Sequence, residues 1–118
     1  MIVGVGIDLV DVDRFMEQLE RAPRLAERLF TDLERRKRSD DSLAARFAAK
    51  EALAKALHTI GDMAWLDAEV VNDDTGRPGF AVRGTVAARC RKLGVRRLHL
   101  SITHDGGFAA AFVIAERE

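Results

Sequence analysis

Hydrophobic and polar residues recur with different periods along the chain, and each change of period marks an expected element. Residues 2–10 are rich in β-branched side chains and carry glycines at positions 4 and 6, which is typical of a buried strand. Between Asp13 and Phe30 the apolar residues recur every 3.6 positions. This spacing predicts an amphipathic helix that Pro23 kinks or restarts.

The middle of the chain holds the clearest helix signal. Residues 42–57, SLAARFAAKEALAKAL, are almost all strong helix formers and include neither glycine nor proline. The preceding residues 31–40 are polar and densely charged, and we interpret them as a connector. Asp40, Asp41 and Ser42 offer oxygens that can cap the long helix.

The second half of the chain predicts short strands around one short helix. The expected strands are 67–72, 79–83, 98–103 and 108–116, and the expected helix is 85–93. The turn sequence DDTGRP joins the first two strands, HDGG joins the last two, and Gly94 closes the helix. We therefore expect an α+β fold over residues 1–118, a single domain with a largely antiparallel sheet packed on one long and two shorter helices.

Composition narrows the classes of partner. Nineteen basic and nineteen acidic residues cancel, so no net field draws the chain to nucleic acid or to an anionic membrane. Cys90 is the only cysteine, which excludes an internal disulfide and a CxxC metal site. The first residues, MIVGVGIDLVDVDRF, lack a basic leader and reach a carboxylate at Asp8. We expect a cytoplasmic protein without a membrane span.

Three charged residues are candidates for phosphate chemistry. Asp8 ends an apolar strand, where a carboxylate is either a turn acid or a group with a partner such as a metal. Glu51 and Lys55 are four apart on the long helix, a spacing that suits a plain ion pair. Alanine covers much of that helix, so both side chains are also placed to share a partly buried site. There the carboxylate would hold Mg²⁺ and the ammonium would neutralise phosphate oxygens.

Two further sets of residues are open to more than one interpretation. Thr103 and His104 enter a glycine turn, where His104 is either a proton carrier or simply solvated. One arc of the first helix carries four arginines, Arg14, Arg21, Arg24 and Arg28. This arc is either a solvated face or a docking site for an acidic protein.

The sequence has no GxxxxGK[ST], GxGxxG, HExxH or GxSxG motif, which disfavours common nucleotide-binding and hydrolase folds.

Three segments together resemble the holo-acyl-carrier-protein synthase family of phosphopantetheinyl transferases. They are GVGIDLVDVDRF at 4–15, RFAAKEALAKAL at 46–57 and SITHDGGFAAAFVIAE at 101–116. The resemblance implies a magnesium-dependent transferase of fatty-acid biosynthesis. Such an enzyme moves 4′-phosphopantetheine from coenzyme A to a serine of apo acyl carrier protein and releases adenosine 3′,5′-bisphosphate.

The resemblance also implies site residues and an assembly. It implies a homotrimer with active sites between subunits, in which Asp8 and Glu51 hold Mg²⁺ with the pyrophosphate of coenzyme A, while Lys55 contacts phosphate. Residues that match nucleotide-contacting segments are Arg46, Lys50, Arg77, Pro78, Thr103 and His104. The basic arc matches the helix that docks the acidic carrier. For the catalytic base we prefer Glu51, with His104 second.

Other functions fit the same residues. A magnesium-dependent hydrolase of a pyrophosphate compound would use Asp8, Glu51 and Lys55 on water. A non-catalytic module would bind an acidic partner through the first helix. The chain also departs from the family after the long helix, where His58-Thr59-Ile60-Gly61 replaces a Gly-Thr-Gly-like turn and puts the phosphate cradle in question.

Overall fold

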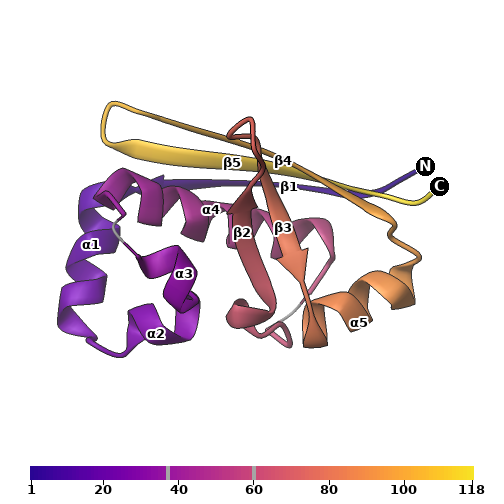
Figure 1. The fold of residues 1–118 in the computed structure, drawn as a ribbon, viewed down its shortest axis with the longest axis horizontal. Helices are drawn as coiled ribbons and strands as arrows, with labels where there is room; N and C mark the ends of the chain where they lie inside the picture. The colour runs from indigo at the N-terminus through magenta and orange to yellow at the C-terminus, as the bar shows by residue number, and fades with distance from the viewer. Residues whose placement is uncertain (37, 60) are drawn as a thin grey trace.

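A three-stranded antiparallel sheet lies along one side of the molecule, with the helices and a separate hairpin on its other side (Figure 1). The computed structural model describes residues 1–36, 38–59 and 61–118. Its elements, in chain order, are β1 (Ile2–Asp11), α1 (Val12–Arg21), α2 (Leu25–Leu29), α3 (Asp32–Arg35), α4 (Asp40–Ala56), the 3₁₀ turn η1 (Trp65–Asp67), β2 (Ala68–Asn72), β3 (Pro78–Val82), α5 (Gly84–Leu93), β4 (Arg97–Asp105) and β5 (Phe108–Glu116).

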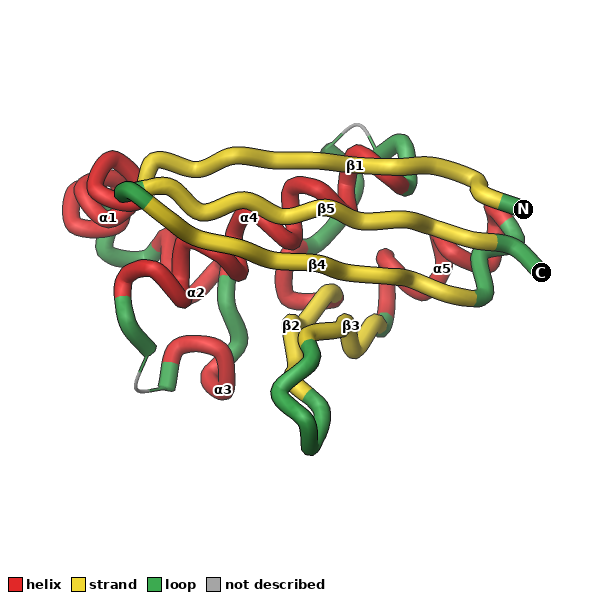
Figure 2. Tube along the Cα trace, turned by 90° about the horizontal axis from the view of Figure 1, so that it is seen from above, coloured by secondary structure: helices red, strands yellow, loops and turns green. Residues whose placement is uncertain are grey.

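The sheet has β5 in its centre, flanked by β1 and β4 (Figure 2). In its register Asp8 lies opposite Ala111, which in turn lies opposite Ile102. Side chains alternate between the two faces of a strand, so these residues share the face that α4 covers. Leu9 and Thr103 are each one position further along, and they lie on the opposite face.

Close backbone packing joins β1 to α4. A Cβ atom on Gly4 would overlap the carbonyl oxygen of Ala56, and one on Gly6 would overlap that of Ala52. The strand can therefore touch the helix backbone only because neither glycine has a side chain. On the helix, the facing alanines are fully buried and add little bulk.

The remaining elements surround this unit. The β2–β3 hairpin projects beside the sheet, and α5 connects it to β4 at the end of the molecule where both termini lie (Figures 1 and 2). The amino group of Met1 donates to the carbonyl of Arg117. Gly94, with a φ of 74°, ends α5 in the left-handed conformation that glycine adopts most easily.

The fold confirms the expected α+β class with an antiparallel sheet and corrects several boundaries. The helix expected from Asp13 to Phe30 restarts at Pro23 as predicted, because α1 ends at Arg21 and α2 begins at Leu25, and its ends are shifted to Val12 and Leu29. The expected connector contains α3, whose capping box joins Thr31 and Glu34. Threonine followed three residues later by glutamate is a sequence signature of that box.

The cap of the long helix and the surroundings of the first strand also differ from expectation. Ser39, rather than residues 40–42, caps α4, because its hydroxyl accepts a hydrogen bond from the Ser42 amide. The first strand is buried on one face only. Ile7 and Leu9 on its other face are 64% and 65% exposed.

Within the described residues, none of the helices is both long and apolar enough to cross a bilayer.

Replacing Gly6 with alanine tests the contact between β1 and α4. The added Cβ must displace the Ala52 carbonyl, so we expect Gly6→Ala to lower the free energy of unfolding by about 3 kcal/mol. Gly79→Ala is the matched control, because a Cβ there meets nothing within 4 Å among the described residues. Urea unfolding of both variants measures the difference, and equal midpoints would contradict the packing role of Gly6.

Candidate active site

A cavity of about 330 Å³ lies where the end of β1, the start of α1 and the middle of α4 meet. It collects the three residues that the sequence singled out for phosphate chemistry, Asp8, Glu51 and Lys55. β1 supplies Asp8 from its inner face, and α4 supplies the other two from adjacent turns. Arg14 and Phe47 contribute to the same wall.

The charges in this cavity influence one another. The Lys55 Nζ donates to the carbonyl of Ile7 at 2.9 Å and to Asp8 Oδ1 at 3.3 Å. Burial raises the pKa of Asp8, while the neighbouring ammonium partly offsets that effect. Burial also raises the pKa of Glu51, and the negative charge of Asp8 raises it further. The two carboxylates are therefore close enough to repel each other, and a cation would relieve the repulsion.

This donor set suits a magnesium ion. Proteins hold Mg²⁺ with one or two carboxylates and leave its other positions to water and substrate phosphates. Asp8 and Glu51 supply two such carboxylates in one cavity. Over residues 1–36, 38–59 and 61–118, no group of three or more His, Cys, Asp or Glu residues forms a site that could hold a metal. The two carboxylates thus fit a Mg²⁺ ion whose remaining coordination positions are filled by water and by a phosphate ligand.

A second cavity, of about 290 Å³, continues from the same pair of residues on α4. Glu51 and Lys55 line it together with the segment that follows the helix. The other lining residues are Ala54, Thr59, Gly61, Met63 and Trp65. Phe47 stands between the two cavities, because its ring stacks on Phe15 at 4.7 Å between centroids and meets the Trp65 ring at 5.9 Å. Glu51 and Lys55 therefore face both cavities.

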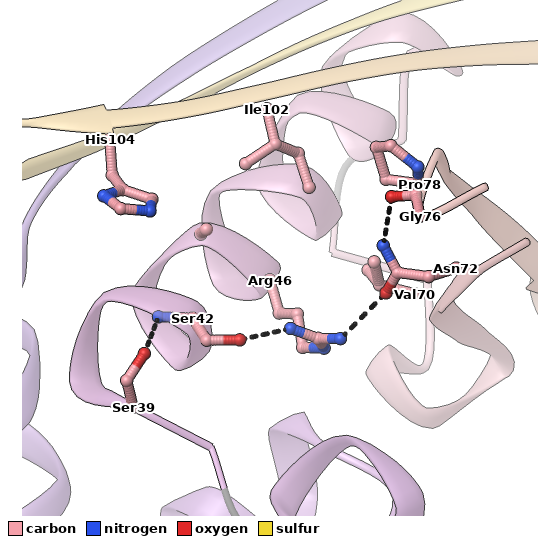
Figure 3. Close-up of a pocket in the computed structure, with 10 residues that line it drawn as sticks. Ser39, Ser42, Arg46, Val70, Asn72, Gly76, Pro78, Ile102 and His104 are labelled. Atoms are coloured by element: carbon pink, nitrogen blue, oxygen red, sulfur yellow. Dashed lines mark hydrogen bonds between the residues drawn. The ribbon is translucent and has the colours of Figure 1, made fainter.

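A third cavity, of about 250 Å³, lies between α4, the hairpin and β4 (Figure 3). It contains Arg46, Pro78 and His104, three of the residues expected to contact a nucleotide. Arg46 is 6% exposed and donates to Ser42 Oγ and to Asn72 Oδ1. Its Nε has no hydrogen-bond partner among the described residues, so this buried guanidinium keeps a free donor.

Lys50 lies elsewhere, and the structure gives no support to the nucleotide contact expected of it. Its side chain is fully buried, and its Nζ donates to the Leu29 carbonyl at 2.5 Å, to Glu34 Oε1 at 2.7 Å and to the Trp65 carbonyl at 3.1 Å. An ammonium has three protons, so these acceptors use all of them. Lys50 holds α3 and η1 against α4.

Two other expected nucleotide contacts also lie outside the third cavity. Thr103 is on the outer face of the sheet, where it lines a small hollow of about 170 Å³ with Ile7 and Phe112. Arg77 is exposed in the hairpin turn, and its backbone amide donates to Asp73 Oδ1 at 3.0 Å. Within the described part of the chain, neither residue lines the cavity that holds Arg46.

The two candidate bases occupy different places. Glu51 lies in the first and second cavities, while His104 lines the third, where its Nδ1 is 3.6 Å from Asp41 Oδ2. Among the cavities formed by the described residues of one chain, none is lined by both Glu51 and His104. Glu51 shares its cavity with Lys55 and Asp8, the other two candidates for phosphate chemistry, whereas His104 does not.

The basic arc is only partly continuous. Arg14 and Arg21 belong to α1, whereas Arg24 caps α2 and Arg28 lies within it. All four side chains are exposed. Of these arginines, Arg14 lines the first cavity and links the basic surface to the candidate site.

Several lining residues carried no functional signal in the sequence. Ser39, Ser42 and Asn72 complete the third cavity, and Met63 and Trp65 complete the second. Their residue types are common in loops and cores, and only packing brings them to a cavity. In the segment after α4, where the sequence departs from the family, Ile60 lies outside the described residues, whereas Thr59 and Gly61 line the second cavity.

Comparison with known proteins gives this site a family. The model of the 4′-phosphopantetheinyl transferase superfamily matches residues 4–113. A holo-[acyl-carrier-protein] synthase from Salinispora arenicola is 56% identical over 122 residues, which cover 99% of this chain and 100% of the relative.

Solved structures agree with the sequence matches. The holo-[acyl-carrier-protein] synthase of Neisseria meningitidis superposes with a TM-score of 0.90 at 30% identity, over 99% of this chain and 100% of that one. An ACPS–CoA complex from Chronobacterium ammoniagenes superposes with a TM-score of 0.86 at 36% identity, over 98% and 97% of the two chains. The chain therefore belongs to the 4′-phosphopantetheinyl transferase superfamily and, within it, to the holo-[acyl-carrier-protein] synthases.

Proposed function

We propose that this protein transfers 4′-phosphopantetheine from coenzyme A to a serine of an apo acyl carrier protein and releases adenosine 3′,5′-bisphosphate. The convergence of Asp8, Glu51 and Lys55 on one cavity carries the proposal, in a chain that belongs to this family. Coenzyme A is present in solved structures of relatives from Chronobacterium ammoniagenes and Helicobacter pylori, which supports it as the donor here.

The reaction sets two requirements for the protein. The serine oxygen forms a bond to the β-phosphorus of coenzyme A, and the bond from that phosphorus to the bridging oxygen breaks, so the bisphosphate leaves with the electron pair. Negative charge must be neutralised on the pyrophosphate, and the serine proton must be removed. Lys55 is placed for the first task, and Glu51 is our preferred base for the second, with His104 as the alternative.

Asp8 and Glu51 would hold Mg²⁺ in this cavity. When bound, the ion supplies positive charge beside the pyrophosphate and helps to fix its orientation. Lys55 already donates to Asp8, so its ammonium lies at the edge of the proposed metal site. It can shift to a phosphate oxygen without leaving the cavity that it lines.

The position of the nucleotide end supports active sites between subunits. Arg46 and Glu51 are five residues apart on α4, so their side chains diverge by about 140° around the helix axis. The cavity with Arg46, Pro78 and His104 therefore opens on a different side of α4 from the proposed metal site. In an assembly, the Arg46 cavity of one chain can complete the metal site of another.

The outer face of the sheet supports the homotrimer. Large apolar side chains project from it without cover, among them Ile7 and Leu9 on β1 and Phe112, which is 41% exposed, on β5. Exposed apolar surfaces of this kind usually mark an interface between proteins. Further copies of the chain are the partners that we propose, and Thr103 on this face would lie in their interface.

The carrier would dock beside the metal site. Arg14 at the rim of the first cavity and the exposed Arg21, Arg24 and Arg28 offer positive charge to an acidic acyl carrier protein.

We further propose that the enzyme works in the cytoplasm and serves fatty-acid synthesis. A magnesium-dependent hydrolase of pyrophosphate compounds remains the second candidate, because Asp8, Glu51 and Lys55 would orient water equally well.

Intact-mass measurement of an apo acyl carrier protein tests the proposed reaction. We expect the carrier to gain one phosphopantetheine group in the presence of the protein, coenzyme A and Mg²⁺, and to gain nothing when a chelator is added. Cleavage of coenzyme A without any gain of mass by the carrier would instead favour the hydrolase.

Glu51→Gln tests the assignment of the site. The substitution removes the charge at nearly constant shape, so we expect kcat/KM to fall at least about a hundredfold while the fold is kept. Asp8→Asn should act in the same direction. Glu20→Gln is the matched control, because Glu20 is exposed on α1 and belongs to none of the cavities formed by the described residues. Full activity of Glu51→Gln would refute the assignment.

Phe112→Lys tests the assembly. A lysine at this position would place a charge in the proposed interface, so we expect the trimer to separate into single chains and transfer to be lost. Leu66→Lys is the control, since Leu66 is 40% exposed but lies on η1, outside the sheet. Light scattering gives the mass of each variant. Unchanged mass for Phe112→Lys would place the interface elsewhere.

A further inference from the structure

We infer that α5 positions the wall of the second cavity through Arg89 and Thr85, and that these two residues thereby control the affinity for coenzyme A, because Glu51 and Lys55 of the proposed metal and phosphate site line that cavity too; this inference rests on the proposed function. Neither residue is among the described residues that line that cavity. Both instead bind the backbone of the segment that forms the wall. They are therefore positioning residues.

Arg89 holds the point where the chain leaves α4. Its Nε donates to the Leu57 carbonyl at 2.9 Å, and its Nη2 donates to the His58 carbonyl at 3.0 Å. These carbonyls follow the last turn of α4, where helix geometry leaves acceptors without partners. A guanidinium satisfies both and also places positive charge at the negative end of the helix dipole. Arg89 thus fixes the direction in which the chain leaves the helix.

His58 explains why this point requires an external support. Its backbone φ is 56°, in the left-handed region that residues other than glycine rarely adopt. A histidine held there carries a conformational cost that a glycine would not. The two bonds from Arg89 act on His58 and on the residue before it, so they offset this cost. Thr59, the next residue, lines the second cavity.

Thr85 holds the other end of the wall. Its hydroxyl oxygen accepts from the Ala64 amide at 3.0 Å and donates to Asp67 Oδ2 at 2.8 Å. The Thr85 amide donates to the same carboxylate at 2.8 Å. Ala64 lies between Met63 and Trp65, which both line the second cavity. Thr85 therefore fixes the backbone that presents these two side chains.

The two anchors share one face of α5. Thr85 and Arg89 are four residues apart, so they stand one above the other on the helix. Val86 and Cys90, one position further along, are buried and hold α5 in the core. Between the anchored ends lie Thr59, Gly61 and Met63, which line the same cavity as Glu51 and Lys55. The shape of the cavity thus depends on a helix that does not line it.

The test compares Arg89→Gln and Thr85→Val with Arg91→Gln, a matched control for the arginine because Arg91 is exposed on the same helix. Calorimetry with coenzyme A and Mg²⁺ gives Kd, and steady-state kinetics give KM and kcat. We expect Kd and KM for coenzyme A to rise about tenfold in both test variants, with kcat and the KM for the carrier within about twofold. Arg89→Lys should recover part of the affinity, and Arg91→Gln should match the wild type.

Trp65, the single tryptophan of the chain, gives a readout that needs no ligand. Its fluorescence emission should shift in folded Thr85→Val and stay unchanged in Arg91→Gln. If Arg89→Gln does not fold, the Kd values of Arg89→Lys and Thr85→Val are compared with that of the wild type instead. Binding of coenzyme A by folded Arg89→Lys and Thr85→Val with the Kd of the wild type would overturn the role of α5. Failure of the wild type itself to bind coenzyme A would overturn the proposed function instead.

Discussion

The contact between the backbones of β1 and α4 is the constraint on which the candidate site depends. Gly4 and Gly6 let the strand approach the helix until the carbonyls of Ala52 and Ala56 occupy the space of the missing side chains. At this separation the Nζ of Lys55, which lies between these two alanines on the helix, reaches both Ile7 and Asp8. A wider separation would leave Asp8 on the sheet without a partner from the helix. The glycines of the first strand thus serve the site without belonging to it.

Burial gives two lysines of α4 opposite roles. Lys50 is fully buried and forms an ion pair with Glu34, which also accepts from the Val70 amide. Removing one partner of such a pair would leave an uncompensated charge in the interior, so the pair ties α3 and β2 firmly to the helix. Lys55, five residues later, keeps 55% of its side chain exposed and faces the cavities. The residue type is the same, and its surroundings decide whether it supports the fold or is available to a ligand.

The helix α4 also separates the site into parts. Glu51 and Lys55 face the cavities beside β1 and the segment that follows the helix, whereas Arg46 faces the hairpin and β4. One chain therefore presents the proposed metal site on one side of the helix and a cavity with a buried guanidinium on another. The uncovered apolar face of the sheet offers a means to bring the parts of different chains together. The proposed function and the proposed assembly therefore both depend on how α4 is placed against the sheet.

The sequence by itself determined the α+β class, the long helix and both hairpins, because these follow from local period, helix propensity and turn residues, whereas only the family resemblance grouped Asp8 with Glu51 and Lys55. Tertiary structure alone decided that Lys50 is buried while Arg46 lines a cavity, and that Thr103 and His104, adjacent in sequence, lie on opposite faces of the sheet. It also decided the roles of Thr85 and Arg89, whose partners lie 18 to 32 residues away. Local patterns specify which elements form, but the partner of a polar side chain is set by how those elements pack.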